Sequence, residues 1–179
     1  KNLILKPIDR NLIKLKKLKN NSKATFYSIP TKIAGQSYKS KISLIAKTIK
    51  KNKSDYLFIS APENVAWLLN IRGADIPFSP IPNCNLIISK NKKIYLIANV
   101  SKLSKLLKEK KILKNQVINP NNFKILINKL NGNRIILDSK SCSIYYENII
   151  SSKLVVSHRE DPCYFFKSIK NKKEIDYMK

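Results

Sequence analysis

Glycine is scarce in this chain of 179 residues, which holds only Gly35, Gly73 and Gly132. Each of the three stands alone in the sequence. Walker-type phosphate loops and dinucleotide-binding fingerprints need closely spaced glycines, because backbone N–H groups must approach the phosphate without side chains in the way. The sequence therefore excludes both kinds of nucleotide site.

The residues that carry hydrolytic chemistry are also sparse. His158 is the only histidine, no Gly-x-Ser-x-Gly elbow supplies a nucleophilic serine, and the eleven acidic residues are spread along the chain. Asp55 and Asp138 end or begin predicted strands, where we expect them to cap or to form turns. We expect His158 to be solvated or to cap. No catalytic residue and no metal ligand is predicted in this chain.

Cysteine and long apolar runs are few. Cys84, Cys142 and Cys163 are odd in number, far apart and without a C-x-x-C pair, so neither a disulfide framework nor a zinc ribbon is expected. No stretch approaches the roughly eighteen apolar residues of a membrane span, and no signal-peptide pattern is visible. A cytoplasmic location without a membrane partner is the default expectation.

Acidic residues are outnumbered, with 36 Lys and Arg against 11 Asp and Glu and a formal net charge of +25. Such a charge could indicate a polyanionic partner. However, Lys, Asn and Ile dominate every segment alike, as a compositional bias would produce. Arginine, the better fork for phosphate, is rare. We therefore consider nucleic acid an unlikely partner and keep a polyanion-binding module as the alternative function.

Short apolar runs alternate with amphipathic stretches. Strands are predicted at 55–60, 85–89, 94–98, 116–118, 134–138 and 153–157. Helices are predicted at 8–20, after an N-cap at Ser37, at 62–69, from Ser101 to about 110, at 120–132 and at 141–150. The alternation predicts an α/β fold with a mixed sheet of five or six strands flanked by helices. Residues 165–169 look extended, and Asn171 with Glu174 predicts a capping box for a further helix.

The segment 70–82, Asn-Ile-Arg-Gly-Ala-Asp-Ile-Pro-Phe-Ser-Pro-Ile-Pro, is the most unusual in the chain. It is too rich in proline for regular structure and long enough to be functional. It follows a predicted helix with Trp67 and displays Arg72 and Asp75 around Gly73. Two interpretations remain open: an Arg72–Asp75 pair that only fixes the loop, with Trp67 as core filling, or a functional surface.

Three segments resemble a known family. Residues 65–77, Val-Ala-Trp-Leu-Leu-Asn-Ile-Arg-Gly-Ala-Asp-Ile-Pro, resemble the signature of the middle domain of three-domain Xaa-Pro aminopeptidases of the creatinase/prolidase kind. Residues 33–37 are similar to the Tyr-Ala-Gly-x-Ser entry to that domain, although Ile33 stands where an aromatic residue is common. Residues 161–174 are similar to the lead-in to the catalytic domain, except for Cys-Tyr-Phe-Phe after Pro162.

The resemblance implies a division into three parts. Residues 1–30 would be the tail of a first N-terminal domain and a connector, 31–160 a creatinase/prolidase-like N-terminal domain, and 161–179 a linker and the first helix of a pita-bread catalytic domain. In such enzymes the catalytic domain holds two divalent metal ions, manganese or zinc, which activate a water for attack on the bond before proline. None of those ligands lies in this chain, so we expect it to be inactive alone.

The resemblance also implies partners for this chain. They are its own C-terminal catalytic domain, a proline-containing peptide substrate and a second copy in a homodimer. Arg72, with Trp67 and Asp75, would form part of the wall of the substrate pocket. A parent protein that keeps this fold but has lost its metal ligands remains a further alternative.

Overall fold

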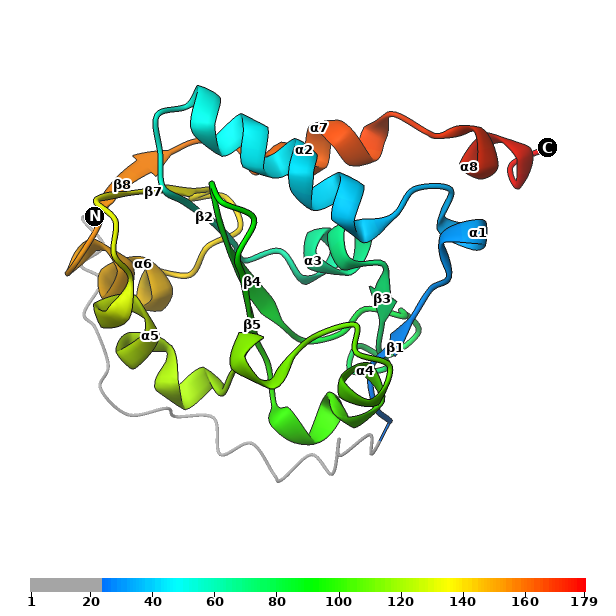
Figure 1. The fold of residues 1–179 in the computed structure, drawn as a ribbon, viewed down its shortest axis with the longest axis horizontal. Helices are drawn as coiled ribbons and strands as arrows, with labels where there is room; N and C mark the ends of the chain where they lie inside the picture. The colour runs from blue at the N-terminus through cyan, green and yellow to red at the C-terminus, as the bar shows by residue number, and fades with distance from the viewer. Residues whose placement is uncertain (1–23) are drawn as a thin grey trace, which may run out of the picture.

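The centre of the molecule is a six-stranded sheet (Figure 1). The computed structural model describes residues 24–179, so the helix predicted at 8–20 lies outside the described residues. The strands are β2 (Tyr56–Ile59), β4 (Asn85–Ser89), β5 (Ile94–Ile97), β6 (Val117–Ile118), β7 (Arg134–Leu137) and β8 (Val155–His158). Their order across the sheet is β6-β5-β4-β2-β7-β8.

The sheet is mixed, as predicted. β2 pairs antiparallel with β4 and parallel with β7, and Phe58 lies opposite Ile87 on one side and Leu137 on the other. β4 and β5 form the predicted antiparallel hairpin, while β6 and β8 add parallel strands at the two edges. β2 is buried along its whole length, which its continuous apolar sequence predicts for a central strand.

Helices cover both faces of the sheet. The α-helices are α1 (Thr31–Ala34), α2 (Tyr38–Lys51), α3 (Pro62–Leu69), α4 (Ser104–Lys108), α5 (Phe123–Lys129), α6 (Ile144–Ser151), α7 (Pro162–Ser168) and α8 (Lys172–Asp176). Three 3-10 turns accompany them at Val100–Lys102, Lys114–Gln116 and Pro120–Asn122. Two predicted caps are confirmed: the Ser37 hydroxyl accepts from the Ser40 N–H, and Asn171 and Glu174 form a capping box.

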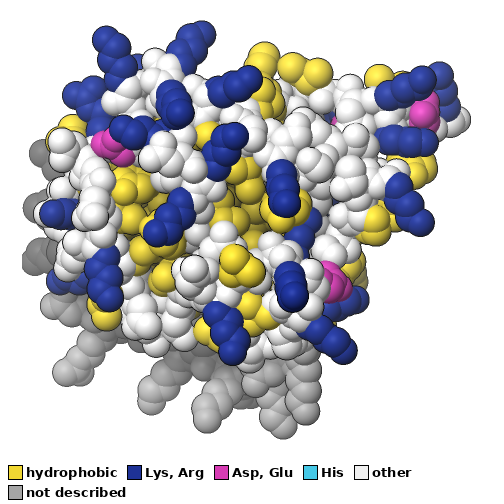
Figure 2. All heavy atoms as spheres, in the orientation of Figure 1, with side chains coloured by type: hydrophobic (Ala, Val, Ile, Leu, Met, Phe, Trp, Pro, Cys, Tyr) yellow, Lys and Arg dark blue, Asp and Glu magenta, His cyan; other side chains and the backbone are white. Residues whose placement is uncertain are grey.

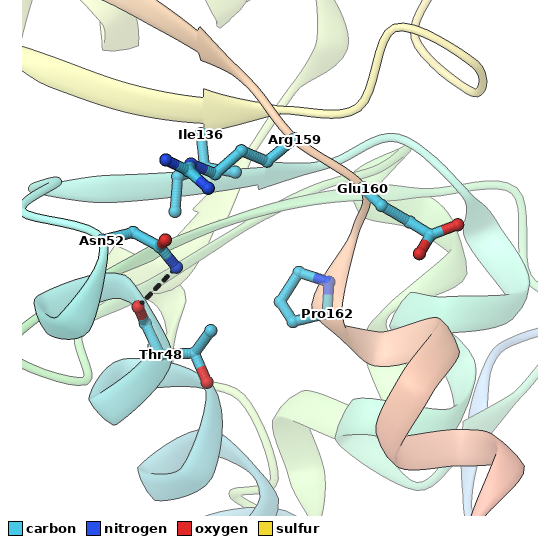
Figure 3. Close-up of a pocket in the computed structure, with 6 residues that line it drawn as sticks. All are labelled: Thr48, Asn52, Ile136, Arg159, Glu160 and Pro162. Carbon is cyan, nitrogen blue, oxygen red and sulfur yellow. Dashed lines mark hydrogen bonds between the residues drawn. The ribbon is translucent and has the colours of Figure 1, made fainter.

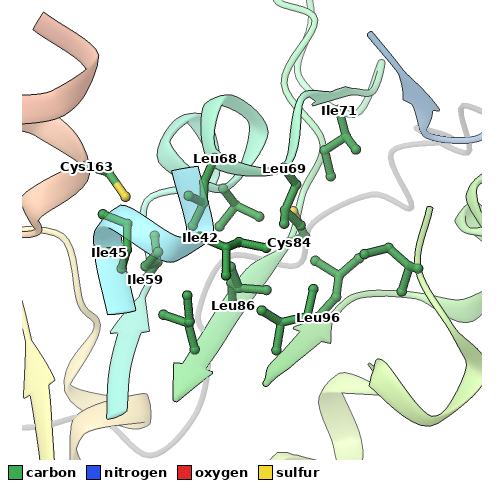
Figure 4. Packing of buried hydrophobic residues seen from close by; sticks show 14 of the residues in the cluster. Ile42, Ile45, Ile59, Leu68, Leu69, Ile71, Cys84, Leu86, Leu96 and Cys163 are labelled. Atoms are coloured by element: carbon green, nitrogen blue, oxygen red, sulfur yellow. The ribbon is translucent and has the colours of Figure 1, made fainter. Parts of the chain in front are cut away.

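The larger core lies between the sheet and helices α2, α3 and α7 (Figure 4). Side chains of β2 alternate between the faces, so Leu57 and Ile59 point into this core while Tyr56 and Phe58 point into the other. The buried partners from the helices are Ile42, Ile45, Ile49, Val65, Leu68, Leu69 and Cys163. The second core lies under α5 and α6, where Phe123 and Tyr146 pack edge to face at a centroid distance of 4.8 Å.

A second, two-stranded sheet was not predicted. β1 (Tyr27–Ser28) pairs antiparallel with β3 (Ile71–Arg72), so the start of the proline-rich segment has regular structure after all. The prediction that segment 70–82 lacks regular structure is wrong for these two residues, because the prolines come only after them. β1 lies within the segment 1–30, so that segment contacts the following part of the chain.

The segment that looked extended at 165–169 is mostly helical, since α7 runs to Ser168. The Asp161 carboxylate caps this helix by accepting from the Cys163 N–H at 2.9 Å, and Pro162 occupies its first turn. Cys163 in the first turn of α7 is buried in the core together with residues of α2 and α3. The domain boundary between residues 160 and 161 stays a prediction. Helix α7 follows this boundary and packs against α2 and α3, which precede it.

Other helix boundaries differ by a few residues. Asn99 rather than Ser101 provides the cap near the predicted fourth helix, and α4 itself begins at Ser104. The helix predicted at 141–150 begins at Ile144, because Asp138 first holds a turn by accepting from the Lys140 N–H.

Lysine and arginine side chains are spread over the face in view rather than gathered in one patch (Figure 2). Acidic side chains interrupt them at few places. Among the described residues, Lys90 pairs with Asp55 and Lys102 with Asp75, and the His158 Nε2 atom lies 3.4 Å from Glu147. Most of the positive charge in this part of the chain is therefore solvated instead of paired.

Candidate functional site

Helix α3 ends in a left-handed residue that turns the chain toward the proline-rich loop. Asn70 has a φ of 50°, a conformation that asparagine tolerates better than most residues, and its N–H returns to the carbonyl groups of Ala66 and Trp67. Its side-chain amide donates to the Gln36 carbonyl at 2.8 Å. Trp67, near the end of α3, and Arg72, in β3, therefore lie on either side of Asn70 in the sequence. We call residues 67–72 the Trp67–Arg72 turn.

Trp67 is half-buried and packs against the larger core. The Nζ atom of Lys41 lies 4.3 Å from the centroid of its ring, within the range of a cation–π interaction. The indole is therefore held from two sides, by apolar neighbours and by a cation. Trp67 does serve as core filling, while the rest of its surface remains accessible.

Arg72 does not pair with Asp75. Its Nη1 atom donates to the carbonyl oxygen of Ile71 at 2.8 Å and, more weakly, to that of Ala66 at 3.4 Å. Among the described residues, its Nε and Nη2 atoms make no hydrogen bond. The guanidinium thus uses one nitrogen to fix itself near the end of α3 and keeps donors that a carbonyl or carboxylate group could accept from.

Asp75 stabilises the proline-rich loop (residues 70–82) through two polar contacts. Its carboxylate pairs with Lys102 at 2.9 Å and accepts from the Asn83 N–H at 2.8 Å. Both charged side chains are largely buried, with 13% of Asp75 and 17% of Lys102 exposed. The interpretation that Arg72 pairs with Asp75 is wrong, because the Asp75 carboxylate pairs with Lys102, which is distant in sequence. Asp75 therefore shapes the loop and does not line an open surface.

The tip of the loop is a tight turn closed by a hydrogen bond from the Ser79 N–H to the Ile76 carbonyl. Pro77 and Phe78 are its central residues, and Phe78 has a φ of 60° with its side chain fully exposed. At the base of the loop, Gly73 lies so close to Pro82 that a Cβ atom would approach the Pro82 Cα to 2.7 Å. Glycine is required there by this close approach.

Lys41 is the residue of this site that the sequence analysis does not single out. It is buried, with 2% of its surface exposed, and its ammonium group donates to the Trp67 carbonyl at 2.9 Å and to the Asn70 Oδ1 atom at 2.8 Å. The signal for it is its position on the apolar face of α2, directly before Ile42 and four residues before Ile45.

A shallow hollow of about 260 Å³ lies at the other end of α2 (Figure 3). Its lining residues are Thr48, Asn52, Ile136, Arg159, Glu160 and Pro162. The polar groups of α2 in this hollow serve the helix itself, since the Asn52 amide donates to the Thr48 carbonyl at 2.9 Å. The hollow offers no nucleophile with a base beside it, so the Trp67–Arg72 turn remains the better candidate.

Within residues 24–179, no three His, Cys, Asp or Glu side chains gather closely enough to hold a metal ion. His158 is exposed, with its Nε2 atom 3.4 Å from Glu147. Asp55 and Asp138 act as predicted, because each accepts from backbone N–H groups at the ends of strands. In the same part of the chain, no helix is long and apolar enough to cross a bilayer.

The sequence pattern of the Creatinase/Prolidase N-terminal domain matches residues 17–174, which is most of the chain. The chain belongs to this family. It is 31% identical over 161 residues to Xaa-Pro aminopeptidase 1 of Dictyostelium discoideum, a match that covers 88% of this chain and 25% of that protein. A probable Xaa-Pro aminopeptidase P of Coccidioides posadasii is 38% identical over 80 residues, covering 45% of this chain and 13% of the relative.

Solved structures show the same fold. The X-prolyl aminopeptidase of Caenorhabditis elegans, described as a cytosolic enzyme with a di-nuclear active site, superposes with a TM-score of 0.71 at 19% identity over 87% of this chain and 26% of that one. The N-terminal domain of a Lactobacillus brevis Xaa-Pro dipeptidase gives 0.54 at 12% identity, over 72% of this chain and 99% of that one. The chain spans about a quarter or less of the curated relatives it matches.

Proposed function

We propose that this chain is the non-catalytic N-terminal portion of a metal-dependent Xaa-Pro aminopeptidase, and that it shapes the substrate entrance of that enzyme. The observation that carries the proposal is the match to Xaa-Pro aminopeptidase 1, which is long enough that it must include the Trp67–Arg72 turn. The parent enzyme would remove the first residue from peptides with proline in second place.

We assign the two divalent metal ions, manganese or zinc, to a catalytic domain outside this chain. The di-nuclear active site described for the worm enzyme supports this assignment, because this chain corresponds to 26% of that protein. Such ions supply an activated water and polarise the scissile carbonyl. The part left to this chain is non-covalent: Arg72 offers donors to a peptide carbonyl or carboxylate, and Trp67 offers an aromatic surface beside it.

Exposed apolar side chains support a contact with the rest of the enzyme. Those on and around α7 and α8 are Phe165, Ile169, Ile175, Tyr177 and Met178, each at least 45% exposed. Ile33 of α1 lies on the element that α8 contacts and is 46% exposed. Several large apolar groups near one another on a surface commonly mark an interface. We propose that the catalytic domain covers them.

The homodimer and the cytoplasmic location complete the proposal. The homodimer rests on the family resemblance. The location is supported by the description of the worm enzyme as cytosolic.

The substrate role is tested by Arg72→Met in the longer protein. Methionine keeps the apolar stem of arginine but removes every donor. We expect kcat/KM for Xaa-Pro peptides to fall about tenfold, which corresponds to one lost polar contact of about 1.4 kcal/mol. The control is Arg134→Met, since the Arg134 side chain is exposed on β7. Unchanged kcat/KM in the Arg72 variant, with folding confirmed by circular dichroism, would exclude Arg72 from the entrance.

A polyanion-binding module is the second candidate function, and the net charge of +25 favours it. Its affinity for a single-stranded RNA would arise from phosphate contacts and would fall steeply with salt. Because the lysines are spread over the surface, we expect binding by fluorescence anisotropy to vanish near physiological ionic strength, about 0.15 M. Tight binding that persists there would favour the polyanion function over the peptidase one.

A further inference from the structure

Lys41 is a buried cation on α2 whose hydrogen bonds are made with residues at the end of α3. Its side chain crosses from the first turn of α2 to the end of α3, where its two hydrogen-bond acceptors are the Trp67 carbonyl and the Asn70 side chain. The ring of Trp67 lies 4.3 Å from the same nitrogen. All three contacts are made with one segment, the Trp67–Arg72 turn.

The acceptors explain why a cation is tolerated there. The carbonyl groups in the last turn of a helix carry partial negative charge, and those of Ala66 and Trp67 share a single backbone donor, the Asn70 N–H. Lys41 and Arg72 both donate to such carbonyls at the end of α3. Asn70 links the turn further to the chain before α2 through the Gln36 carbonyl. Lys41 thus connects the Trp67–Arg72 turn to the domain core.

We propose that Lys41 is a positioning residue for the Trp67–Arg72 turn, and that the turn closes more firmly over the core when Lys41 gives up its proton. A neutral amine keeps two N–H donors, which are enough for the Trp67 carbonyl and the Asn70 side chain. It loses the cation–π contact with Trp67 but avoids the cost of burying a charge, which is the larger of the two effects. The proton on Lys41 therefore sets how firmly Trp67 and Arg72 are held.

The titratable and charged groups around Lys41 come from several elements. Together with burial, which is the largest influence, they set the pKa of Lys41 at about 8, lowered from 10.5. Glu174 of α8 and, more weakly, the Cys163 thiol of α7 act to raise this pKa, whereas Arg72 and Lys111 act with burial to lower it. If the turn opens, Lys41 meets water and its pKa returns toward the ordinary value. The closed turn therefore binds the proton more weakly, and closure is favoured as the pH rises from about 8 toward 10.5.

Trp67 is the only tryptophan in the sequence, so tryptophan emission reports on the surroundings of this one residue. We would record emission spectra of the chain from about pH 6 to about pH 9.5, below the ionisation of tyrosine near 10. The native chain is expected to show one transition near pH 8, because the cation over the indole is lost. Hydrogen exchange of the peptide covering the turn gives a second measurement, with protection that rises through the same range after correction for intrinsic rates.

Two variants decide the origin of the transition. Lys41→Met keeps the length of the side chain without a titrating group, and Lys41→Arg keeps a charge throughout the range. We expect both variants to lose the fluorescence transition and the pH-dependent part of the protection. A native chain without a transition, or the same transition in Lys41→Arg, would overturn the proposal, even if Lys41→Met fails to fold.

The consequence for Arg72 rests on the proposed function, whereas the fluorescence experiment uses no peptide and no metal. Failure of the peptidase proposal would leave the fluorescence result unchanged. Conversely, loss of the Lys41 proposal would leave the activity of the longer protein to be judged separately.

Discussion

Phe78 combines two features that folded chains usually avoid in one residue. It has a positive φ, which costs a residue with a Cβ atom about 1 to 2 kcal/mol, and its side chain contacts no core that could offset this cost. It follows a proline in a tight turn, where glycine or asparagine is the usual choice. A large aromatic side chain in this position fits an anchor for a contact outside the chain.

Replacing Phe78 by Asn is expected to raise the free energy of unfolding by up to about 1 kcal/mol, because asparagine adopts positive φ more readily and no buried surface is lost. Urea unfolding of the chain measures this. Phe165→Asn is the matched control, since Phe165 is 62% exposed on a helix and gains nothing from the change. A Phe78 variant less stable than the native chain would show that the side chain packs within the chain after all.

Asp55 connects three parts of the sheet. Its carboxylate accepts from Lys90 at 2.7 Å and from the N–H groups of Asn133 and Arg134 at 2.8 and 3.1 Å. The hydrogen bond from Lys90, followed by that from Asn133, lowers the pKa of Asp55 below 3.8. The stabilisation is therefore present above pH 3.8 and is lost as the pH falls through the folded-state pKa.

Asp55→Asn should consequently lower the free energy of unfolding at neutral pH by about 1 to 2 kcal/mol, since charge-assisted hydrogen bonds are lost. The difference from the native chain should shrink as the pH falls below about 4, where the aspartate itself gains a proton. Urea unfolding at several pH values measures both effects. Asp176→Asn, on the exposed end of α8, serves as control. A difference that stays constant with pH would contradict this account.

Capping and strand-end roles of single residues could be predicted from the sequence, whereas the partners of side chains distant in sequence could not. The cap at Ser37 and the strand-end roles of Asp55 and Asp138 follow from short spacings along the chain. The partner of Asp75 lies 27 residues away, so only the folded chain reveals Lys102. Lys41 was missed although it lies four residues before Ile45 on the apolar face of α2, because a lysine is rarely fully buried.

At the scale of elements, a buried polar network attaches α7 to α3. The side-chain amide of Asn64 donates to the Asp161 carboxylate at 2.7 Å, and the Lys167 ammonium group donates to the Asn64 Oδ1 atom at 2.6 Å. Asn64 and Asp161 are 0% and 1% exposed. The same carboxylate caps α7, so one residue both starts the helix and fixes it to its neighbour.

Asp161→Ala removes the helix cap and leaves the buried Asn64 amide without its acceptor. We expect the free energy of unfolding to fall by about 2 to 4 kcal/mol, from the sum of a lost cap and an unsatisfied buried donor. Denaturant unfolding measures the loss. Glu160→Ala tests the neighbouring exposed carboxylate and should change stability by less than about 0.5 kcal/mol. Equal effects of the two substitutions would mean that the network contributes little.

Whether a segment forms a helix or a strand was predictable wherever its apolar residues matched the period of one of the two. The central strands and the β4–β5 hairpin were predicted because continuous apolar runs flank a polar turn. Helix α7 was missed because its aromatic pair, Phe165 and Phe166, suggests a strand, whereas Asp161 and Pro162 before it favour a helix. The pairing of β1 with β3 joins two dipeptides far apart in sequence, and no local pattern predicts it.

For the molecule as a whole, the mixed sheet and the family followed from the sequence, and the position of the turn on the domain required the structure. The net charge gave little guidance to function, because the structure spreads lysines over several elements. The resemblance provided the candidates Arg72, Trp67 and Asp75. The structure then separated them: Arg72 keeps donors that have no partner among residues 24–179, Trp67 packs partly against the core, and Asp75 is enclosed by Lys102 and the Asn83 N–H.

The central proposal is that this chain is part of a peptidase whose chemistry lies outside it. The most direct measurement compares Xaa-Pro peptide cleavage by the 179-residue chain and by the longer protein that includes the following domain, with Mn²⁺ or Zn²⁺ and with EDTA. The account predicts cleavage by the longer protein alone, abolished by EDTA and restored by metal. Cleavage by the 179-residue chain in the presence of EDTA, or none by the longer protein with either metal, would contradict it.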